Sequence, residues 1–224
     1  MWLSGRPYIE NFRWKPERGT RFHLFDRESG RVLGPFSADA RFAFHHVNAY
    51  EEGEELVVDV CTYPDPGVVQ DLYLARLRAG GPVPAAHLER FRIAPGSDEV
   101  SIERLLEEPI ELARINYMRC NERPYRYVWG VGIRSGWLGT IVKGDVVDGS
   151  AGVWERDGCF PGEPVFVARP GAEDEDDGVL LSVVLDSRTE RSFLLVLDAR
   201  SLEELARAEV PHHIPFGFHG QFAR

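Results

Sequence analysis

The chain has 224 residues, 43% of them hydrophobic and 11% aromatic, which is enough to build one large all-β domain or two small domains around a real core. Its formal net charge is −10, from 36 acidic and 26 basic side chains, and this argues against nucleic acid as a partner because phosphate binding needs a basic face. No apolar run reaches the roughly 20 residues required to cross a bilayer.

The first third of the chain predicts short strands separated by turn residues. A hairpin is expected over 23–33, and a second over 42–63 with its turn at 51–54. Residues 71–77 alternate apolar and polar side chains with a period of two, which predicts a further strand. The Gly- and Pro-rich stretch 79–85 is the best linker candidate, and it is short enough to be a loop within one domain.

The rest of the chain continues this pattern, with little helical signal. Only two segments, 101–108 and 201–206, predict one or two helical turns each, with Ser101 and Ser201 as N-caps. Strands are expected at 125–133, 140–147, 152–155, 178–186 and 192–198, the last two forming a hairpin. Turns recurring about every eight to twelve residues are typical of a sandwich, barrel or propeller. The sequence has no strict internal repeat, so a WD-type propeller is not indicated.

Two further features bear on location and metal binding. Cys61, Cys120 and Cys159 are an odd number without CxxC spacing, which disfavours a disulfide framework or zinc ribbon and favours a reducing, cytoplasmic location. The acidic run 173–177 predicts a solvated loop. Its alternative, a carboxylate metal site, lacks the spacing of an EF-hand loop.

Two histidines lie in strand-like, aromatic sequence at opposite ends of the chain. His45 follows Phe44, and His219 follows Phe216 and Phe218. Neutral imidazole is the commonest protein metal ligand, although either histidine alone is better explained as a core side chain hydrogen-bonded to the backbone. Together they suggest strands that converge on one metal.

Two glutamates, Glu111 and Glu163, are lone acids in apolar context. A buried carboxylate is costly unless it is paired or hydrogen-bonded. Accepting the free N–H of a metal-bound histidine would meet that requirement and fix the tautomer of the ring. The alternative is a structural acid paired with arginine, and Arg114 is close in sequence.

Six segments, spread over most of the chain, together resemble the carotenoid oxygenases, the family of carotenoid and stilbene cleavage dioxygenases that includes the retinal pigment epithelium isomerohydrolase. They occur in the order found in that family. The segments are FHHVNAYE (44–51), ELARINY (111–117), YRYVWG (125–130), GEPVFVARPGA (162–172), EDDGVLLSVVLD (175–186) and PFGFHGQF (215–222).

The resemblance implies a seven-bladed β-propeller with a non-haem Fe(II) on its axis, bound by four histidines, three of which are oriented by glutamates. The third and fourth ligands match His45 and His219, and the glutamates match Glu111 and Glu163. His46 then points the other way, as strand alternation requires. The only histidine before His45 is His23, in a setting that resembles a family strand without a metal ligand. Residues 1–224 are therefore expected to be the C-terminal portion of such a propeller domain, with the first blades missing.

The implied activity is addition of O₂ across a conjugated double bond of a carotenoid or apocarotenoid, giving aldehyde or ketone products. Its reactants are a hydrophobic polyene and O₂, its cofactor is Fe(II), and peripheral membrane contact is one route for extracting the polyene. The alternative is a truncated, non-catalytic fragment of such an enzyme, because only two of the four iron ligands have a match.

Overall fold

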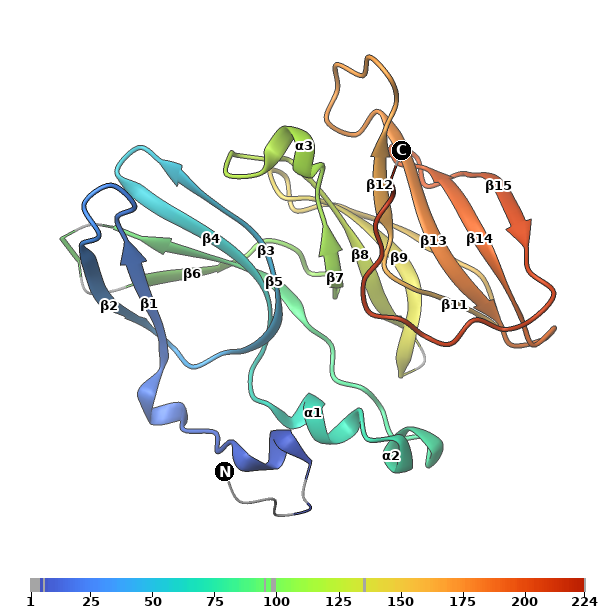
Figure 1. Cartoon of the computed structure of the whole chain (residues 1–224), viewed down its shortest axis with the longest axis horizontal. Coiled ribbons are helices and arrows are strands. Elements are labelled where there is room, and N and C mark those ends of the chain that lie inside the picture. Colours follow the sequence, from blue (N-terminus) through green and yellow to red (C-terminus); the bar gives the residue numbers. More distant parts are fainter. Residues whose placement is uncertain (1–4, 6, 95, 98–99, 135, 224) are drawn as a thin grey trace.

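The computed structural model describes residues 5, 7–94, 96–97, 100–134 and 136–223, and Figure 1 shows it as a row of antiparallel β-sheets. The described strands form one two-stranded, two four-stranded and one five-stranded sheet, joined by short helices and loops. No helix in these ranges is long and apolar enough to cross a membrane. The all-β expectation is confirmed at this level.

The sheets follow the chain in order. The first pairs β1 (Thr20–Phe25) with β2 (Val32–Ala38). The next two contain β3 (Phe42–Glu52), β4 (Glu55–Tyr63), β5 (His87–Ile93) and β6 (Val100–Arg104), then β7 (Glu111–Arg114), β8 (Tyr127–Arg134), β9 (Trp137–Asp145) and β10 (Ala151–Glu155). The last contains β11 (Cys159–Pro161), β12 (Val165–Ala168), β13 (Gly178–Asp186), β14 (Arg191–Asp198) and β15 (Glu204–Glu209).

Helical structure is limited to short pieces: η1 (Tyr8–Asn11), η2 (Pro16–Arg18), α1 (Gly67–Asp71), α2 (Leu74–Arg78) and α3 (Tyr117–Cys120). Figure 1 shows η1, α1 and α2 together on one side of the molecule, while α3 lies on the opposite side. The segment after β15 runs as extended chain without helix or strand to residue 223.

The three predicted hairpins are confirmed as β1–β2, β3–β4 and β13–β14. Alternating burial along β1 and most of β13 is the period-two pattern from which they were expected. The β3–β4 turn contains Gly53 at φ +64°, a conformation that glycine adopts without steric cost.

The strand expected at 71–77 is wrong, because this region forms α1 and α2. Leucine, alanine and arginine dominate α2, and all three have high helix propensity. Leu72 and Leu74 alternate with polar residues but both are exposed, so the alternation does not mark a buried sheet face. Residues 79–85 form a loop after α2, as expected.

The helical turns expected at 101–108 and 201–206 are also wrong. Ser101 to Arg104 pair with β5, and Glu204 to Ala206 pair with β14. In a local turn, Ser201 donates both its backbone N–H and its hydroxyl to the Asp198 carboxylate, so Asp198 is the capping residue, and the chain then continues as an edge strand. Pairing with an adjacent strand outweighs a weak local preference for helix.

The acidic run 173–177 lies in a loop, but it is less solvated than expected. The Lys143 ammonium lies 2.6 Å from a carboxylate oxygen of buried Asp176, and Arg200 contacts Asp176 at 3.4 Å. The Glu175 carboxylate accepts backbone N–H groups of Arg126 and Tyr127. These acids therefore fasten the loop to the β7–β10 sheet and the turn after β14.

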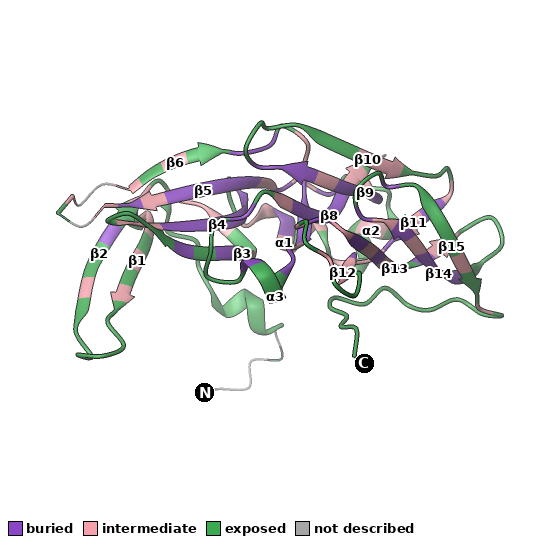
Figure 2. Cartoon of the chain, turned by 90° about the horizontal axis from the view of Figure 1, so that it is seen from above, coloured by how far each residue is buried: buried purple, intermediate pink, exposed green. Residues whose placement is uncertain are grey.

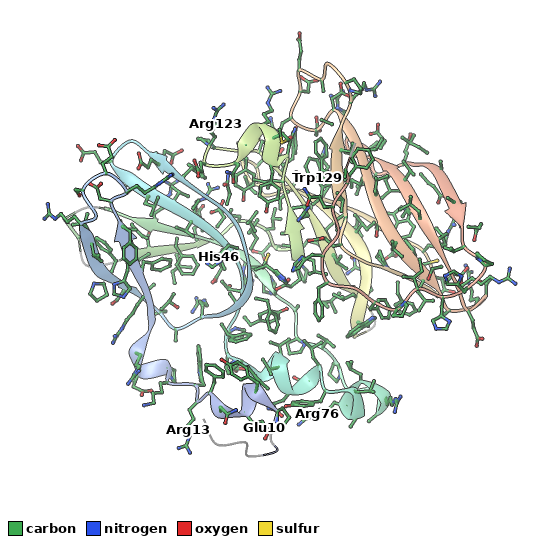
Figure 3. All side chains as sticks on the ribbon, in the orientation of Figure 1. Glu10, Arg13, His46, Arg76, Arg123 and Trp129 are labelled. Carbon is green, nitrogen blue, oxygen red and sulfur yellow. The ribbon has the colours of Figure 1, made fainter. Side chains whose placement is uncertain are left out.

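The hydrophobic core lies within and between neighbouring sheets, where Figure 2 shows most of the buried residues. Trp129 on β8 is fully buried, stacks on Phe166 with ring centroids 4.6 Å apart, and donates its indole N–H to the Ala199 carbonyl at 3.0 Å (Figure 3). Trp129 thus joins the sheet that contains β7 to the sheet that flanks Glu163.

Candidate metal centre

His45 is held on β3 by a carboxylate from the neighbouring sheet. Its Nδ1 lies 2.6 Å from Oε2 of Glu111, the first residue of β7. The side chains of His45 and Glu111 are 22% and 9% exposed, so the contact is largely shielded from water. This hydrogen bond raises the pKa of His45, whereas partial burial acts in the opposite direction.

The short strand β7 is irregular directly after Glu111. Leu112 has φ +49°, a left-handed conformation that is uncommon for a side chain of this size, and its N–H lies 2.6 Å from Glu111 Oε2. Glu111 pairs with Val131 and Arg114 with Trp129, so three steps along β7 oppose two steps along β8. An inserted residue of this kind is a β-bulge, a feature frequent beside functional sites.

His219 is held by a second carboxylate, although its segment belongs to no sheet. Its Nδ1 lies 3.0 Å from Oε1 of Glu163, while Oε2 of Glu163 accepts the Gly220 N–H at 2.8 Å. Glu163 lies in the connection between β11 and β12, and its side chain is only 5% exposed. The His219 side chain is 55% exposed.

The two imidazoles meet although 174 positions separate them in the chain. Nε2 of His45 lies 3.3 Å from Nε2 of His219, and the ring planes are at 81°. Two imidazoles bound to one metal ion would have Nε2 atoms about 3 to 4 Å apart, and the observed separation lies in that range. The expected contacts of the Glu111 and Glu163 carboxylates with histidine Nδ1 atoms are found as well.

This arrangement fits a shared cation. A carboxylate at Nδ1 favours the tautomer in which Nδ1 carries the proton, which leaves a lone pair on Nε2. Two such lone pairs facing each other at 3.3 Å repel unless a proton or a metal ion lies between them. Bonds of about 2.0–2.2 Å from one ion to both nitrogens accommodate that separation.

Two imidazoles are not a complete set of metal ligands. Among the described residues, no group of three or more His, Cys, Asp or Glu side chains could hold a metal ion. His46 on β3 is exposed, in keeping with the expected orientation away from His45. His23 is exposed on β1, in the sheet at the outer end of the row in Figure 1.

The contacts of Arg114 bear on the alternative explanation, in which Glu111 and Glu163 are structural acids paired with an arginine. Its Nη1 lies 3.7 Å from Glu163 Oε1, and its Nη2 donates to the Gly220 carbonyl at 3.2 Å. Glu163 therefore has an arginine partner in addition to His219, whereas no ion pair links Arg114 to Glu111 in the described part of the chain. Glu163 therefore fits both explanations, because it contacts an arginine and a histidine.

An apolar cavity of about 590 Å³ opens beside His45 and Glu111. Its walls come from η1, β3, β4, α1, α2, β7, β8, β9 and the segment before His219 and include Phe44, Tyr63, Leu72, Trp137 and Phe218. Burial and the neighbouring Glu111 carboxylate raise the pKa of Tyr63, so the phenol stays protonated. Sequence reasoning missed these walls, because only the fold brings these elements together.

Comparison with known proteins identifies the family. The RPE65 family model, described as retinal pigment epithelial membrane protein, matches residues 2–224. A mitochondrial carotenoid-cleaving dioxygenase of Macaca fascicularis is 33% identical over 98% of this chain and 47% of its own length. A chloroplastic carotenoid cleavage dioxygenase 8 homolog A of Oryza sativa subsp. japonica is 38% identical over 93% of this chain and 40% of its own.

Solved structures support the same family. The cobalt-substituted form of the Synechocystis apocarotenoid oxygenase matches 95% of this chain and 45% of its own length, with a TM-score of 0.85 and 30% sequence identity. The chain therefore belongs to the RPE65, or carotenoid oxygenase, family, as its motifs predicted. It spans about half the length of the curated relatives it matches.

Proposed function

We propose that residues 1–224 form the C-terminal portion of a β-propeller carotenoid oxygenase, which cleaves a conjugated double bond of a carotenoid or apocarotenoid with O₂. The reaction consumes one C=C bond and one O₂ and yields two carbonyl groups. The chain is proposed to supply His45 and His219 as two of the four iron ligands. Family membership and the opposed imidazoles support this assignment.

The observation that carries the proposal is the pairing of each imidazole with its own carboxylate. Glu111 and Glu163 hold the Nδ1 atoms, so both Nε2 lone pairs are presented to one point. Such carboxylate–histidine pairs fix ring orientation and raise the basicity of a metal ligand. A similar oxygenase, that of Synechocystis, was crystallised with cobalt substituted.

Bound Fe(II) would supply the one-electron and O₂ chemistry that protein side chains lack. The residues of this chain supply orientation and exclusion of water. Glu111 and Glu163 keep a proton on each Nδ1 and direct each Nε2 inward. Phe44 and Tyr63 shield the His45 side of the site, their rings lying 5.8 Å apart.

The cavity beside His45 suits a hydrophobic polyene. Its lining is largely aliphatic and aromatic, and His45 and Glu111 are among its few polar members. A long apolar ligand would gain the free energy of burial there and bring a double bond toward the two imidazoles. Related proteins are named for cleaving carotenoids, including a human beta,beta-carotene 15,15'-dioxygenase.

We also propose that the molecule takes up its substrate through peripheral membrane contact. Ile9, Phe12, Leu72 and Leu74 are exposed apolar side chains on η1, α1–α2 and the adjoining chain. Ile9 and Leu72 also line the cavity, so the exposed patch and the apolar chamber are continuous. A membrane-dissolved substrate would then enter the cavity without crossing water.

A second candidate is a non-catalytic chain. It is favoured by the ligand count, because the described residues contain two imidazoles at the site and no further group that completes a metal centre. Two imidazoles alone bind iron weakly. We therefore expect residues 1–224 by themselves to bind Fe(II) poorly and to show no turnover of carotenoids.

A chimera separates the two candidates. The part of the Synechocystis oxygenase that this chain does not match is fused to residues 1–224, and the product is loaded anaerobically with Fe(II). Formation of aldehydes or ketones from a panel of carotenoids and apocarotenoids is then measured by chromatography. Turnover that is lost in the His45→Ala and His219→Ala variants is the expected result.

His46→Ala in the same chimera is the matched control, because His46 lies next to a proposed ligand but is exposed on β3. It should retain activity. A folded chimera that binds iron but gives no product from any polyene would favour the non-catalytic candidate. Robust turnover by residues 1–224 alone would show that the site is completed by another route, such as a second subunit.

A further inference from the structure

The segment that carries His219 is tied down at two places. At its start, the buried Ser192 on β14 donates its N–H to the His212 carbonyl, and its hydroxyl accepts the Ile214 N–H at 2.9 Å. At its end, the contacts come from Glu163 and Arg114. Between them, Phe216 makes an edge contact with Trp137, with ring centroids 5.8 Å apart.

The guanidinium of Arg114 faces two acceptors at the second place. Nη1 approaches the Glu163 carboxylate and Nη2 donates to the Gly220 carbonyl, while the guanidinium lies over the Tyr117 ring at 5.5 Å. Glu163 in turn receives the Gly220 N–H. Both peptide groups that flank Gly220, next to His219, are therefore held by side chains from other elements.

The bulge in β7 explains how Arg114 reaches this position. Side chains three residues apart on a regular strand point to opposite faces. Their partners Val131 and Trp129 are two residues apart, so the extra residue returns Arg114 to the face of Glu111. One four-residue strand thereby serves both imidazoles, Glu111 acting on His45 and Arg114 on the His219 segment.

We infer that Arg114 is a positioning residue for His219, which holds the C-terminal segment by bridging the Glu163 carboxylate and the Gly220 carbonyl. The inference rests on the proposed function in one respect: metal binding is the reason why His219 has to be positioned. A planar guanidinium offers two donors in a fixed fork, which a lysine ammonium cannot reproduce. The predicted consequence is a segment that detaches locally when the fork is lost.

Hydrogen exchange on the full chain without metal tests this directly. In Arg114→Ala, the Gly220 amide, the N–H of residues 214–222 that Glu163 accepts, should exchange at least roughly ten-fold faster, while the amides of β3–β6 stay unchanged. Cobalt titration of the same variant in the Synechocystis chimera should show about ten-fold weaker binding of Co²⁺, the typical effect of losing an outer-shell contact. Unchanged exchange of 214–222 in Arg114→Ala would overturn the inference.

Two further variants keep the test decisive. Arg123→Ala, at an exposed arginine after α3, should behave as wild type, because the Arg123 carbonyl that accepts from Asn48 is retained. Arg114→Lys reaches one acceptor but not both, so its exchange should lie between wild type and alanine. If Arg114→Ala also speeds exchange in β3–β6, the Arg114→Lys variant provides the test instead. Exchange of residues 214–222 at the wild-type rate in Arg114→Lys would refute the role of the two-donor guanidinium.

The outcome also separates this inference from the proposed function. Failure of the wild-type chimera to bind Co²⁺ counts against the metal site, whereas the exchange of residues 214–222 is measured on residues 1–224 without metal. Normal exchange in Arg114→Ala together with intact cobalt binding counts against Arg114 alone.

Discussion

The two carboxylate–histidine pairs reach the same point by different means. His45 lies within a four-stranded sheet, its side chain is 22% exposed, and Glu111 holds one nitrogen. His219 lies on unpaired chain, its side chain is 55% exposed, and Glu163 holds both its Nδ1 and the next backbone N–H. Where no sheet fixes the backbone, side chains of other elements take over that task.

This difference predicts equal roles in metal binding but unequal roles in structure. On the side of His45, the backbone position comes from strand pairing and Glu111 sets the ring. On the side of His219, Glu163 sets the ring and the backbone together. Variants at each pair therefore test whether the two pairs differ in this way.

The largest expected effect is on metal binding by the histidines themselves. His45→Ala and His219→Ala should each weaken Co²⁺ binding by more than about 100-fold, because a lost ligand costs more than the 10–100-fold of a lost outer partner. Visible absorption during cobalt titration of these variants in the chimera measures this. His46→Ala should be silent. Retention of binding in either alanine variant would remove that histidine from the site.

A smaller effect is expected from the carboxylates. Glu111→Gln and Glu163→Gln should each weaken Co²⁺ binding by about 10–100-fold, since glutamine is a poorer acceptor for Nδ1–H. Only the Glu163 variant should also speed hydrogen exchange in 214–222, because only Glu163 accepts a backbone N–H of that segment. Equal exchange in both variants would contradict the asymmetry.

The smallest effect is on stability without metal. One oxygen of the Glu111 carboxylate is buried and has no hydrogen-bond partner among the described residues. His45→Ala removes the imidazole partner of the other oxygen, so we expect a loss of about 1–3 kcal/mol in the free energy of unfolding. His219→Ala should change it by less than about 0.5 kcal/mol, as is usual for exposed side chains. Urea unfolding followed by circular dichroism measures both, and a larger loss for His219 would reverse the comparison.

Much of the fold could be predicted from local pattern. The hairpins at β3–β4 and β13–β14 follow from apolar alternation interrupted by turn residues. The errors at 71–77, 101–108 and 201–206 share one cause. Period and capping residues describe a segment alone, whereas the outcome depended on whether a neighbouring strand was present to pair with it.

The meeting of the two pairs could be predicted from family motifs but not from spacing, because nothing local relates His45 to His219. The fork of Arg114 was beyond either approach. In sequence, Arg114 is simply an arginine near Glu111, and its placement depends on the register between β7 and β8. The cavity walls likewise come from elements spread along the chain, from η1 to the segment before His219.

The bulge at Leu112 has a consequence for anyone who varies this protein. If β7 kept its four residues but paired regularly with β8, Glu111 and Arg114 would be three positions apart without a bulge and would face opposite sides of the sheet. Deleting one residue between them would instead leave them two positions apart and on the same face. Variants that shorten β7 by one residue should therefore keep the two side chains on one face, whereas variants that straighten the strand at its present length should separate them.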